Sequence, residues 1–147
     1  MEARFIILFG LCLLAAVTDI YSYKVKNHII VTGILAGYIF FIHSYGVQGL
    51  LYSTLGLCIP LLSMITFYRF KLFGAGDLKL FAMIGAITGP KDIAIIMAVT
   101  FVFGAVIGAA KIVFFDRSIG LHKIRFAVPT FIGVATYVFG IIPGFIL

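Results

Sequence analysis

The sequence predicts an all-α fold, a polytopic membrane helical bundle with six transmembrane helices. Three observations lead to this prediction. The 147-residue chain is 63% hydrophobic and only 11% charged, and its mean hydropathy is +1.24. A soluble domain of this length cannot remove so much apolar surface from water, whereas lipid accommodates it. The apolar residues form runs separated by short polar breaks, and the length suits one domain, residues 1–147.

The first three apolar runs predict three spans in order. Residues 5–23 form the first, and because residues 1–4 carry no net positive charge, we expect a retained span instead of a cleaved signal peptide. Residues 28–43 form a second span that is short, since crossing a bilayer takes about 20 residues. Residues 47–68 form the third, in which Pro60 predicts a kink because proline removes a helical hydrogen bond.

The last three runs complete the bundle. Residues 72–88 predict a short fourth span, which the pair Gly89-Pro90 ends because these residue types break helices. Residues 93–115 predict the fifth span and residues 126–147 the sixth. The sequence therefore predicts five connections, all of them short.

The distribution of lysine and arginine predicts the orientation, because cytoplasmic loops carry an excess of both. Nine of the 11 basic residues fall in or beside the connections after the first, third and fifth spans. These nine are Lys24, Lys26, Arg69, Lys71, Lys79, Lys111, Arg117, Lys123 and Arg125. We therefore expect these three connections in the cytoplasm and both termini on the non-cytoplasmic side.

Two of the five acidic residues, Asp19 and Asp77, lie within predicted spans. A charged side chain there costs roughly 2.5–3.5 kcal/mol on insertion scales, so such residues are functional candidates. Asp19 is four residues before the end of the first span, about 6 Å at 1.5 Å per residue. Asp77 is five residues into the fourth span, about 7–8 Å from the same face. The two carboxylates are therefore expected to meet at a similar depth.

A pair of neighbouring carboxylates shares a proton and titrates as a unit, because two adjacent negative charges are costly. The charged carboxylate can take a proton from a water that attacks a peptide carbonyl, while the neutral one donates a hydrogen bond to the carbonyl oxygen. The same groups could relay protons in a proton-coupled transporter or channel. They could also pair with a lysine for structural reasons alone. The residue types by themselves leave these three alternatives open.

Three segments carry a resemblance to a known family. Residues 19–27 read Asp-Ile-Tyr-Ser-Tyr-Lys-Val-Lys-Asn, residues 73–80 read Phe-Gly-Ala-Gly-Asp-Leu-Lys-Leu, and residues 125–133 read Arg-Phe-Ala-Val-Pro-Thr-Phe-Ile-Gly. In this order the segments resemble the two aspartate signatures and the last-helix segment of the type IV prepilin peptidases, which are GxGD intramembrane aspartyl proteases. The three segments together extend over nearly the whole chain.

The resemblance implies an inner-membrane aspartyl endopeptidase with Asp19 and Asp77 as its catalytic pair. Such an enzyme removes the short basic leader of a prepilin-like protein at the cytoplasmic edge of that protein's hydrophobic helix. No cofactor or metal is implied. The alternatives kept beside this interpretation are the proton-coupled transporter and a non-catalytic pilus-assembly subunit.

The sequence departs from the family pattern in two places. Lys26 stands where the family usually has proline, so the bend after the first motif is expected to differ. The larger family members carry a cytoplasmic domain with paired CxxC motifs and also methylate the new N-terminus. This sequence has no CxxC motif, and we expect no soluble methyltransferase domain. It resembles the short, peptidase-only branch of the tight-adherence (Flp) pilus systems, and the archaeal preflagellin peptidases are a related possibility.

Four further motif residues are candidates for the active-site loop. Gly74 and Gly76 have no Cβ, so backbone at these positions can approach an extended substrate closely. Asn27 and Lys79 belong to the matched motifs and are candidates to orient the aspartates or hold substrate backbone. The alternative for Lys79 is a cation that extends to the membrane interface.

Other polar residues suggest no additional chemistry. His28, His43 and His122 lie at different predicted membrane edges and form no metal cluster. Asp92 and Asp116 are expected to be solvated loop charges. The net charge is +6, but the basic residues separate apolar runs, so we expect no nucleic acid partner.

Glycines four residues apart are expected to form packing faces inside the bundle instead of a dimer interface. They are Gly33 and Gly37, Gly85 and Gly89, Gly104 and Gly108, and Gly140 and Gly144.

Membrane lipids are expected partners of the chain. Residues 116–126 mix basic and apolar positions and suit a segment lying on an anionic leaflet. Since these loops and the substrate leader are both cationic, we expect the substrate helix to dock laterally from the bilayer. Its leader would then lie among anionic headgroups.

Overall fold

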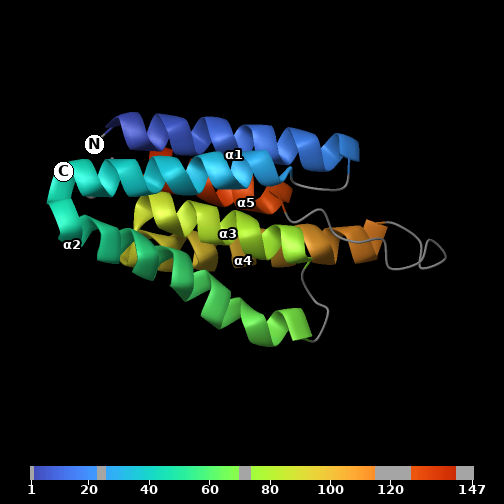
Figure 1. Ribbon diagram of the computed structural model, residues 1–147. Coiled ribbons are helices and arrows are strands. Elements are labelled where there is room, and N and C mark those ends of the chain that lie inside the picture. The colour runs from blue at the N-terminus through green and yellow to red at the C-terminus, as the bar shows by residue number, and fades with distance from the viewer. Residues whose placement is uncertain (1, 23–25, 70–73, 115–126, 142–147) are drawn as a thin grey trace.

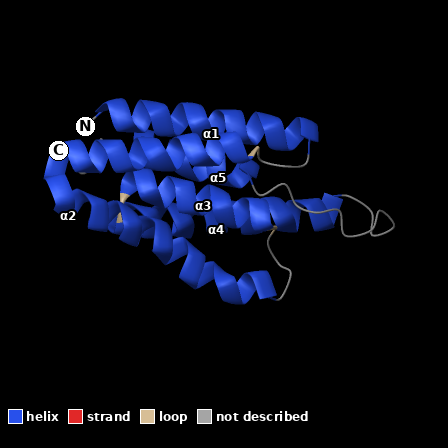
Figure 2. Ribbon diagram, in the orientation of Figure 1, coloured by secondary structure: helices blue, strands red, loops and turns tan. Residues whose placement is uncertain are grey.

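The computed structural model describes residues 2–22, 26–69, 74–114 and 127–141. All regular elements within these ranges are helical. In chain order they are α1 (Glu2–Ser22), α2 (Asn27–Arg69), α3 (Ala75–Thr88), α4 (Pro90–Phe114), α5 (Ala127–Thr136) and the π-helix η1 (Tyr137–Ile141). The helices lie alongside one another in a bundle (Figures 1 and 2). The predicted all-α fold is confirmed for these residues.

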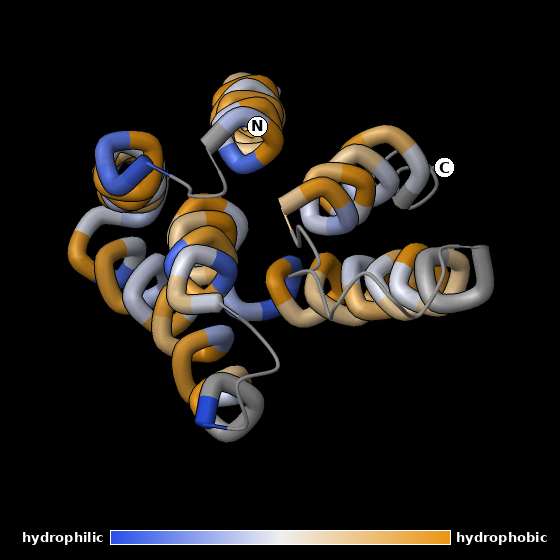
Figure 3. Tube along the Cα trace, turned by 90° about the vertical axis from the view of Figure 1, so that its right-hand side faces the viewer, coloured by the Kyte–Doolittle hydropathy of each residue, from blue (hydrophilic) through white to orange (hydrophobic). Residues whose placement is uncertain are grey.

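Three of the described helices are long and apolar enough to cross a membrane. They contain the apolar segments Ala3–Tyr21, Asn27–Ile65 and Pro90–Ala110, and Ala127–Gly140 is a shorter apolar helix. The helix α3 has 14 residues, about 21 Å, which is less than the hydrocarbon thickness of about 30 Å. A view onto the end of the bundle shows hydrophobic residues along all of its helices (Figure 3). The count of six transmembrane helices stays a prediction.

Helix α2 reverses direction within its length. The backbone angles at Gly46 are non-helical, with φ 58° and ψ −137°, a region that favours glycine because it has no Cβ. Figure 1 shows α2 turning back on itself, so that its two ends lie at the same end of the bundle. The two halves correspond to the predicted second and third spans. The reversal lies at Gly46, whereas Pro60 lies inside the second helical half of α2, where the kink expected from the sequence stays a prediction.

Helix α3 is the most deeply buried element. Residues 80–89 are all buried, and α3 packs most extensively against α2, with further contacts to α1 and α4. Its apolar residues form one core with Leu8, Cys12 and Ala15 of α1. A segment of this length would be a marginal helix alone, so its neighbours stabilise it.

Glycines allow α2 and α3 to pack backbone against backbone. A Cβ at Gly37 would collide with the carbonyl of Ala86, and a Cβ at Gly56 or Gly85 would collide with the carbonyl oxygen of the other residue. The Ser53 hydroxyl also donates a hydrogen bond to the Ala86 carbonyl oxygen at 2.8 Å. Small residues and such polar contacts hold helices together where lipid removes the hydrophobic driving force.

Two of the predicted glycine pairs therefore contribute to packing within the bundle. A Cβ at Gly33 would collide with the Met83 side chain, while one at Gly89 would collide with Tyr52. Gly89 also has φ 91° and ends α3, its N–H donating to the Gly85 carbonyl at 2.8 Å. The chain turns there directly into α4.

The remaining helices close the bundle around α3. The rings of Phe9 in α1 and Phe131 in α5 have centroids 5.0 Å apart. A Cβ at Gly133 of α5 would collide with the hydroxyl oxygen of buried Thr100 in α4. Helix α5 is thereby held against both α1 and α4.

Substitution Gly85→Ala tests the packing of α3 against α2. The added methyl collides with the Gly56 carbonyl, so we expect a loss of about 1–3 kcal/mol of stability and a lower Tm in detergent. The matched control is Gly10→Ala in α1, where a Cβ meets nothing within 4 Å. That control should leave the Tm unchanged or raise it slightly, since alanine favours a helix by about 1 kcal/mol over glycine. Equal Tm values for the two variants would contradict the packing described here.

Candidate active site

Asp77 lies in the first turn of α3, at the third helical position. Gly74 caps the helix in an extended conformation, with φ −80° and ψ 154°, and its N–H donates to Oδ2 of Asp77 at 2.9 Å. The carboxylate thus accepts one of the backbone N–H groups that a helix start leaves without a helical partner. Negative charge is favourable here, because the N-terminus of a helix carries the positive end of its dipole.

The helix begins later than the sequence predicted. The predicted fourth span starts at residue 72, whereas α3 starts at Ala75 and residues 70–73 lie outside the described ranges. Asp77 is therefore about 3 Å along the helix axis from the first residue of α3, and its depth below the membrane face stays a prediction. Glycines at 74 and 76 disfavour helix, which accounts for a start close to the motif.

Asp19 lies in the last turn of α1, three residues before the helix ends at Ser22. That is about 4.5 Å along the axis, and the side chain is partly buried. The neighbouring Thr18 hydroxyl donates to the Ala15 carbonyl oxygen at 3.0 Å. Asp19 is thus close to the negative, C-terminal end of a helix dipole, whereas Asp77 is at a positive end.

The two aspartates belong to the same end of the bundle. The C-terminal end of α1 and the N-terminal ends of α2 and α3 all lie at that end (Figure 1). A hydrogen bond links two of these ends directly, because Nζ of Lys79 in α3 donates to Oδ1 of Asn27 in α2 at 3.2 Å. The start of α2 is thereby held beside the first turn of α3, which carries Asp77. The structure thus brings all six predicted site residues to one end, since Gly74 and Gly76 flank Asp77 at the start of α3.

The two motif glycines complete the predicted set. A Cβ at Gly76 would meet no described atom within 4 Å. The backbone angles of Gly74 are accessible to any residue. Neither the packing at Gly76 nor the conformation at Gly74 requires glycine, so the described structure leaves Gly76 open to approach from outside.

Basic residues surround this end. Lys26, Arg69 and Lys79 are all exposed here, while Arg4 and Lys91 belong to the first turns of α1 and α4 at the opposite end. The predicted positions Lys24, Lys71, Arg117, Lys123 and Arg125 lie outside the described residues, as does the side chain of Lys111. Among the described residues, these three exposed cations lie at the end of the bundle that carries the aspartates, as the charge distribution in the sequence predicts.

One sequence interpretation is wrong. Asp92 was expected to be a solvated loop charge, but it lies in the first turn of α4 and is partly buried. Its Oδ2 is 3.9 Å from Nη2 of Arg4, and it also interacts electrostatically with the hydroxyl of Tyr137. Pro90 followed by an acid is a typical helix start, which is the signal that could have placed it. Asp116 lies outside the described residues.

Within the described ranges, no group of three or more histidine, cysteine, aspartate or glutamate side chains could hold a metal ion. His122 of the predicted membrane edges is not among the described residues.

These features define a class, a helical membrane protein with a pair of carboxylates at one end of its bundle. A family model for the type IV leader peptidase family matches residues 6–109, a range that contains both aspartates and the GxGD motif. The chain belongs to the type IV leader peptidase family and is therefore a peptidase, a hydrolase. Its apolar helices and its family together indicate a membrane protein. The comparisons with curated proteins and with solved structures each gave no match.

The link between Lys79 and Asn27 is testable by a double-mutant cycle with Lys79→Met and Asn27→Ala. We expect a coupling energy of about 0.5–1.5 kcal/mol in unfolding experiments in mixed micelles, because either change removes the same hydrogen bond. Lys91→Met, at the other end of the bundle, is the matched control and should show additive effects with Asn27→Ala. Additivity of Lys79→Met with Asn27→Ala would contradict the link.

Proposed function

We propose that this peptidase is an intramembrane aspartyl endopeptidase that removes the short basic leader from type IV prepilin-like precursors. The observation that carries the proposal is the convergence of the two motif carboxylates on one end of the bundle. Asp19 comes from the end of α1 and Asp77 from the start of α3, far apart in sequence. Membership in a leader peptidase family favours this function over a proton-coupled transporter.

The helix termini suggest which aspartate carries the charge. Asp77 accepts the Gly74 N–H at 2.9 Å at the positive end of α3, so negative charge is stabilised there. Asp19 is near the negative end of α1, where negative charge is less favourable. In the proposed mechanism Asp77 takes a proton from the attacking water. Asp19 donates a hydrogen bond to the peptide carbonyl oxygen as negative charge develops on it.

The proposed substrate is a Flp-type pilin or pseudopilin with a basic leader and a hydrophobic helix. The exposed cations Lys26, Arg69 and Lys79 near the acids support a cytoplasmic location for the cleavage, in the inner membrane, by the positive-inside rule. They also disfavour direct attraction of a cationic leader. The substrate helix would therefore enter from the bilayer, with its leader among anionic lipid headgroups.

The open surface at Gly76 supports a role in substrate approach. Glycine within a helix costs about 1 kcal/mol relative to alanine, and no described contact compensates for it. An extended peptide that lies against the first turn of α3 would meet backbone at this position instead of a side chain. Glycine at position 76 would then be needed to leave room for the substrate, and not for packing within the fold.

The catalytic roles predict large losses for conservative substitutions. Asp77→Asn removes the proton acceptor and Asp19→Asn removes the acid, so each should lower prepilin cleavage by about 10²-fold or more. The residual rate should be higher for Asp19→Asn, because an amide at position 19 still donates a hydrogen bond. Cleavage of a purified prepilin, with sequencing of the product N-terminus, measures both effects.

The control for these variants is Asp92→Asn, which removes an acid at the opposite end. Its rate per folded enzyme should equal the wild-type rate. Cleavage at the wild-type rate by Asp19→Asn or Asp77→Asn would contradict the proposed catalytic pair. A higher residual rate for Asp77→Asn than for Asp19→Asn would reverse the assignment of base and acid.

Gly76→Val separates substrate approach from folding. We expect the Tm to stay unchanged or to rise slightly, because valine has a higher helix propensity than glycine and no described atom lies near the added side chain. Cleavage should fall mainly through a higher KM, because the branched side chain occupies space that the peptide needs. An unchanged KM would refute the role proposed for Gly76.

A further inference from the structure

A small cavity lies at the end of the bundle opposite the aspartates. Its volume is about 110 Å³, and its lining comes from the first turn of α1, with Ala3 and Arg4, and from the last turn of α2 before the reversal at Gly46. The α2 residues are Phe40, Phe41, Ser44 and Tyr45. A water needs roughly 10–15 Å³ of such space, so the cavity has room for a group with several oxygen atoms.

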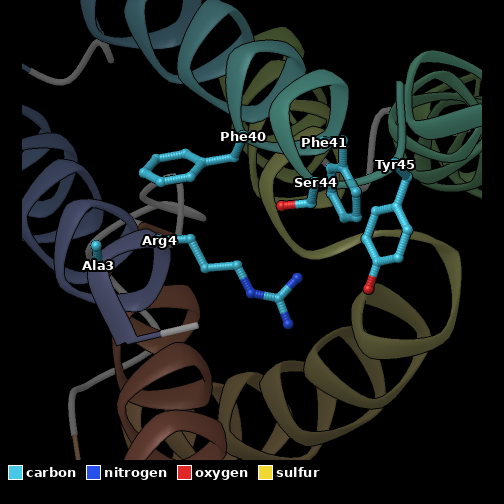
Figure 4. Close-up of a pocket in the computed structure, with 6 residues that line it drawn as sticks. All are labelled: Ala3, Arg4, Phe40, Phe41, Ser44 and Tyr45. Carbon is cyan, nitrogen blue, oxygen red and sulfur yellow. The ribbon is translucent and has the colours of Figure 1, made fainter. Parts of the chain in front are cut away.

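Arg4 supplies the positive charge of this cavity. Figure 4 shows its side chain extending across the pocket toward the turn that carries Ser44 and Tyr45. Its Nε is buried and has no hydrogen-bond partner among the described residues. The guanidinium lies 4.5 Å from the centroid of the Phe5 ring and 5.8 Å from that of Phe41, and aromatic faces attract a cation.

Asp92, the charged neighbour of Arg4, leaves the N–H donors of the Arg4 guanidinium available. Nη2 of Arg4 is 3.9 Å from Oδ2 of Asp92, which is too far for a hydrogen bond. Asp92 also interacts with the hydroxyl of Tyr137, so Arg4 is not its only polar neighbour. Lys91 adds an exposed positive charge one residue away. A buried guanidinium donor without an acceptor is costly, and an anionic ligand would relieve this cost.

The location of the cavity indicates the source of the anion. Ala3 is the first residue of an apolar segment long enough to cross a membrane, so Arg4 lies where the hydrocarbon region meets the headgroups. The neighbouring α2 residues Ile39, Ile42 and Tyr45 are exposed, Ile39 by 67%, and these apolar surfaces suit acyl chains. Guanidinium groups match the geometry of phosphate oxygens well.

We propose that this cavity binds a phosphate group, that of a membrane phospholipid, at the end of the bundle opposite the active site. Arg4 donates from Nε to a phosphate oxygen. The Ser44 hydroxyl, which lines the same cavity, donates to a second oxygen. The bound lipid joins the first turn of α1 to the part of α2 just before the reversal. In the chain, α1 and α2 follow each other at the opposite end of the bundle, where the aspartates lie.

Native mass spectrometry of the full chain in detergent tests the proposal. The three probes are phosphatidylglycerol, a galactolipid without phosphate, and inorganic phosphate. We expect retention of one phosphatidylglycerol, about tenfold tighter than the galactolipid. Equal retention of the two lipids would overturn the proposal. Inorganic phosphate that binds as tightly as phosphatidylglycerol would overturn the lipid source and keep the phosphate site.

Four variants connect the binding to the residues. Arg4→Gln should lose the preference for phosphatidylglycerol. Arg4→Lys keeps the charge near Asp92 but lacks Nε, and Ser44→Ala leaves the Arg4–Asp92 pair untouched, so both should weaken binding severalfold while the protein stays folded. Lys91→Gln is the control for charge alone and should keep the preference. Wild-type retention by Arg4→Lys and Ser44→Ala together would overturn the site even if Arg4→Gln fails to fold.

Discussion

The backbone contact of α3 with both halves of α2 is the constraint on which the rest of the structure depends. Gly56 and Gly85 approach so closely that neither tolerates a Cβ, and Gly37 approaches Ala86 in the same way. These contacts bury residues 80–89 completely, so the second half of α3 is fixed. Its first turn, with Gly76 and Asp77, extends from this fixed segment and is less buried. The packing of α3 therefore limits how far the candidate catalytic carboxylate of Asp77 can move. A rigid element that holds a catalytic group favours precise chemistry.

The bundle separates two kinds of polar interaction between its ends. At one end the acids Asp19 and Asp77 lie near helix termini of opposite polarity, close to exposed basic residues. At the other end Arg4, Asp92 and Tyr137 connect α1, α4 and η1. Charged groups are expensive in the hydrocarbon region, so both sets lie at helix ends. The apolar core between them consists of packing contacts and a few hydroxyl groups that bond to backbone carbonyls.

Much of the fold and part of the site could be predicted from the sequence. The reason is that the position of a membrane helix is set mainly by the apolar run that forms it and by the charged residues at its ends. Apolar run lengths located every described helix to within a few residues, and the lysine and arginine positions indicated which helix ends belong together. Motif spacing identified Asp19, Asp77, Asn27 and Lys79, which the structure places at one end. Asp92 was missed because its partners, Arg4 and Tyr137, are remote in sequence. The sequence predicted the reversal of α2 between its second and third spans, and the structure shows that a positive φ at Gly46 produces it.

The sequence by itself determined the helical class, the apolar segments and the residue types at the site, since composition and short motifs specify these without reference to distant parts of the chain. Only the tertiary structure decided which glycines serve packing and which do not. Gly85 faces a carbonyl from another helix, whereas a Cβ at Gly76 would meet no described atom within 4 Å, although both glycines lie in the same helix. The physical reason is that the effect of lacking a Cβ depends on which atoms lie opposite the glycine. Those atoms come from other parts of the chain, and only the fold brings them there.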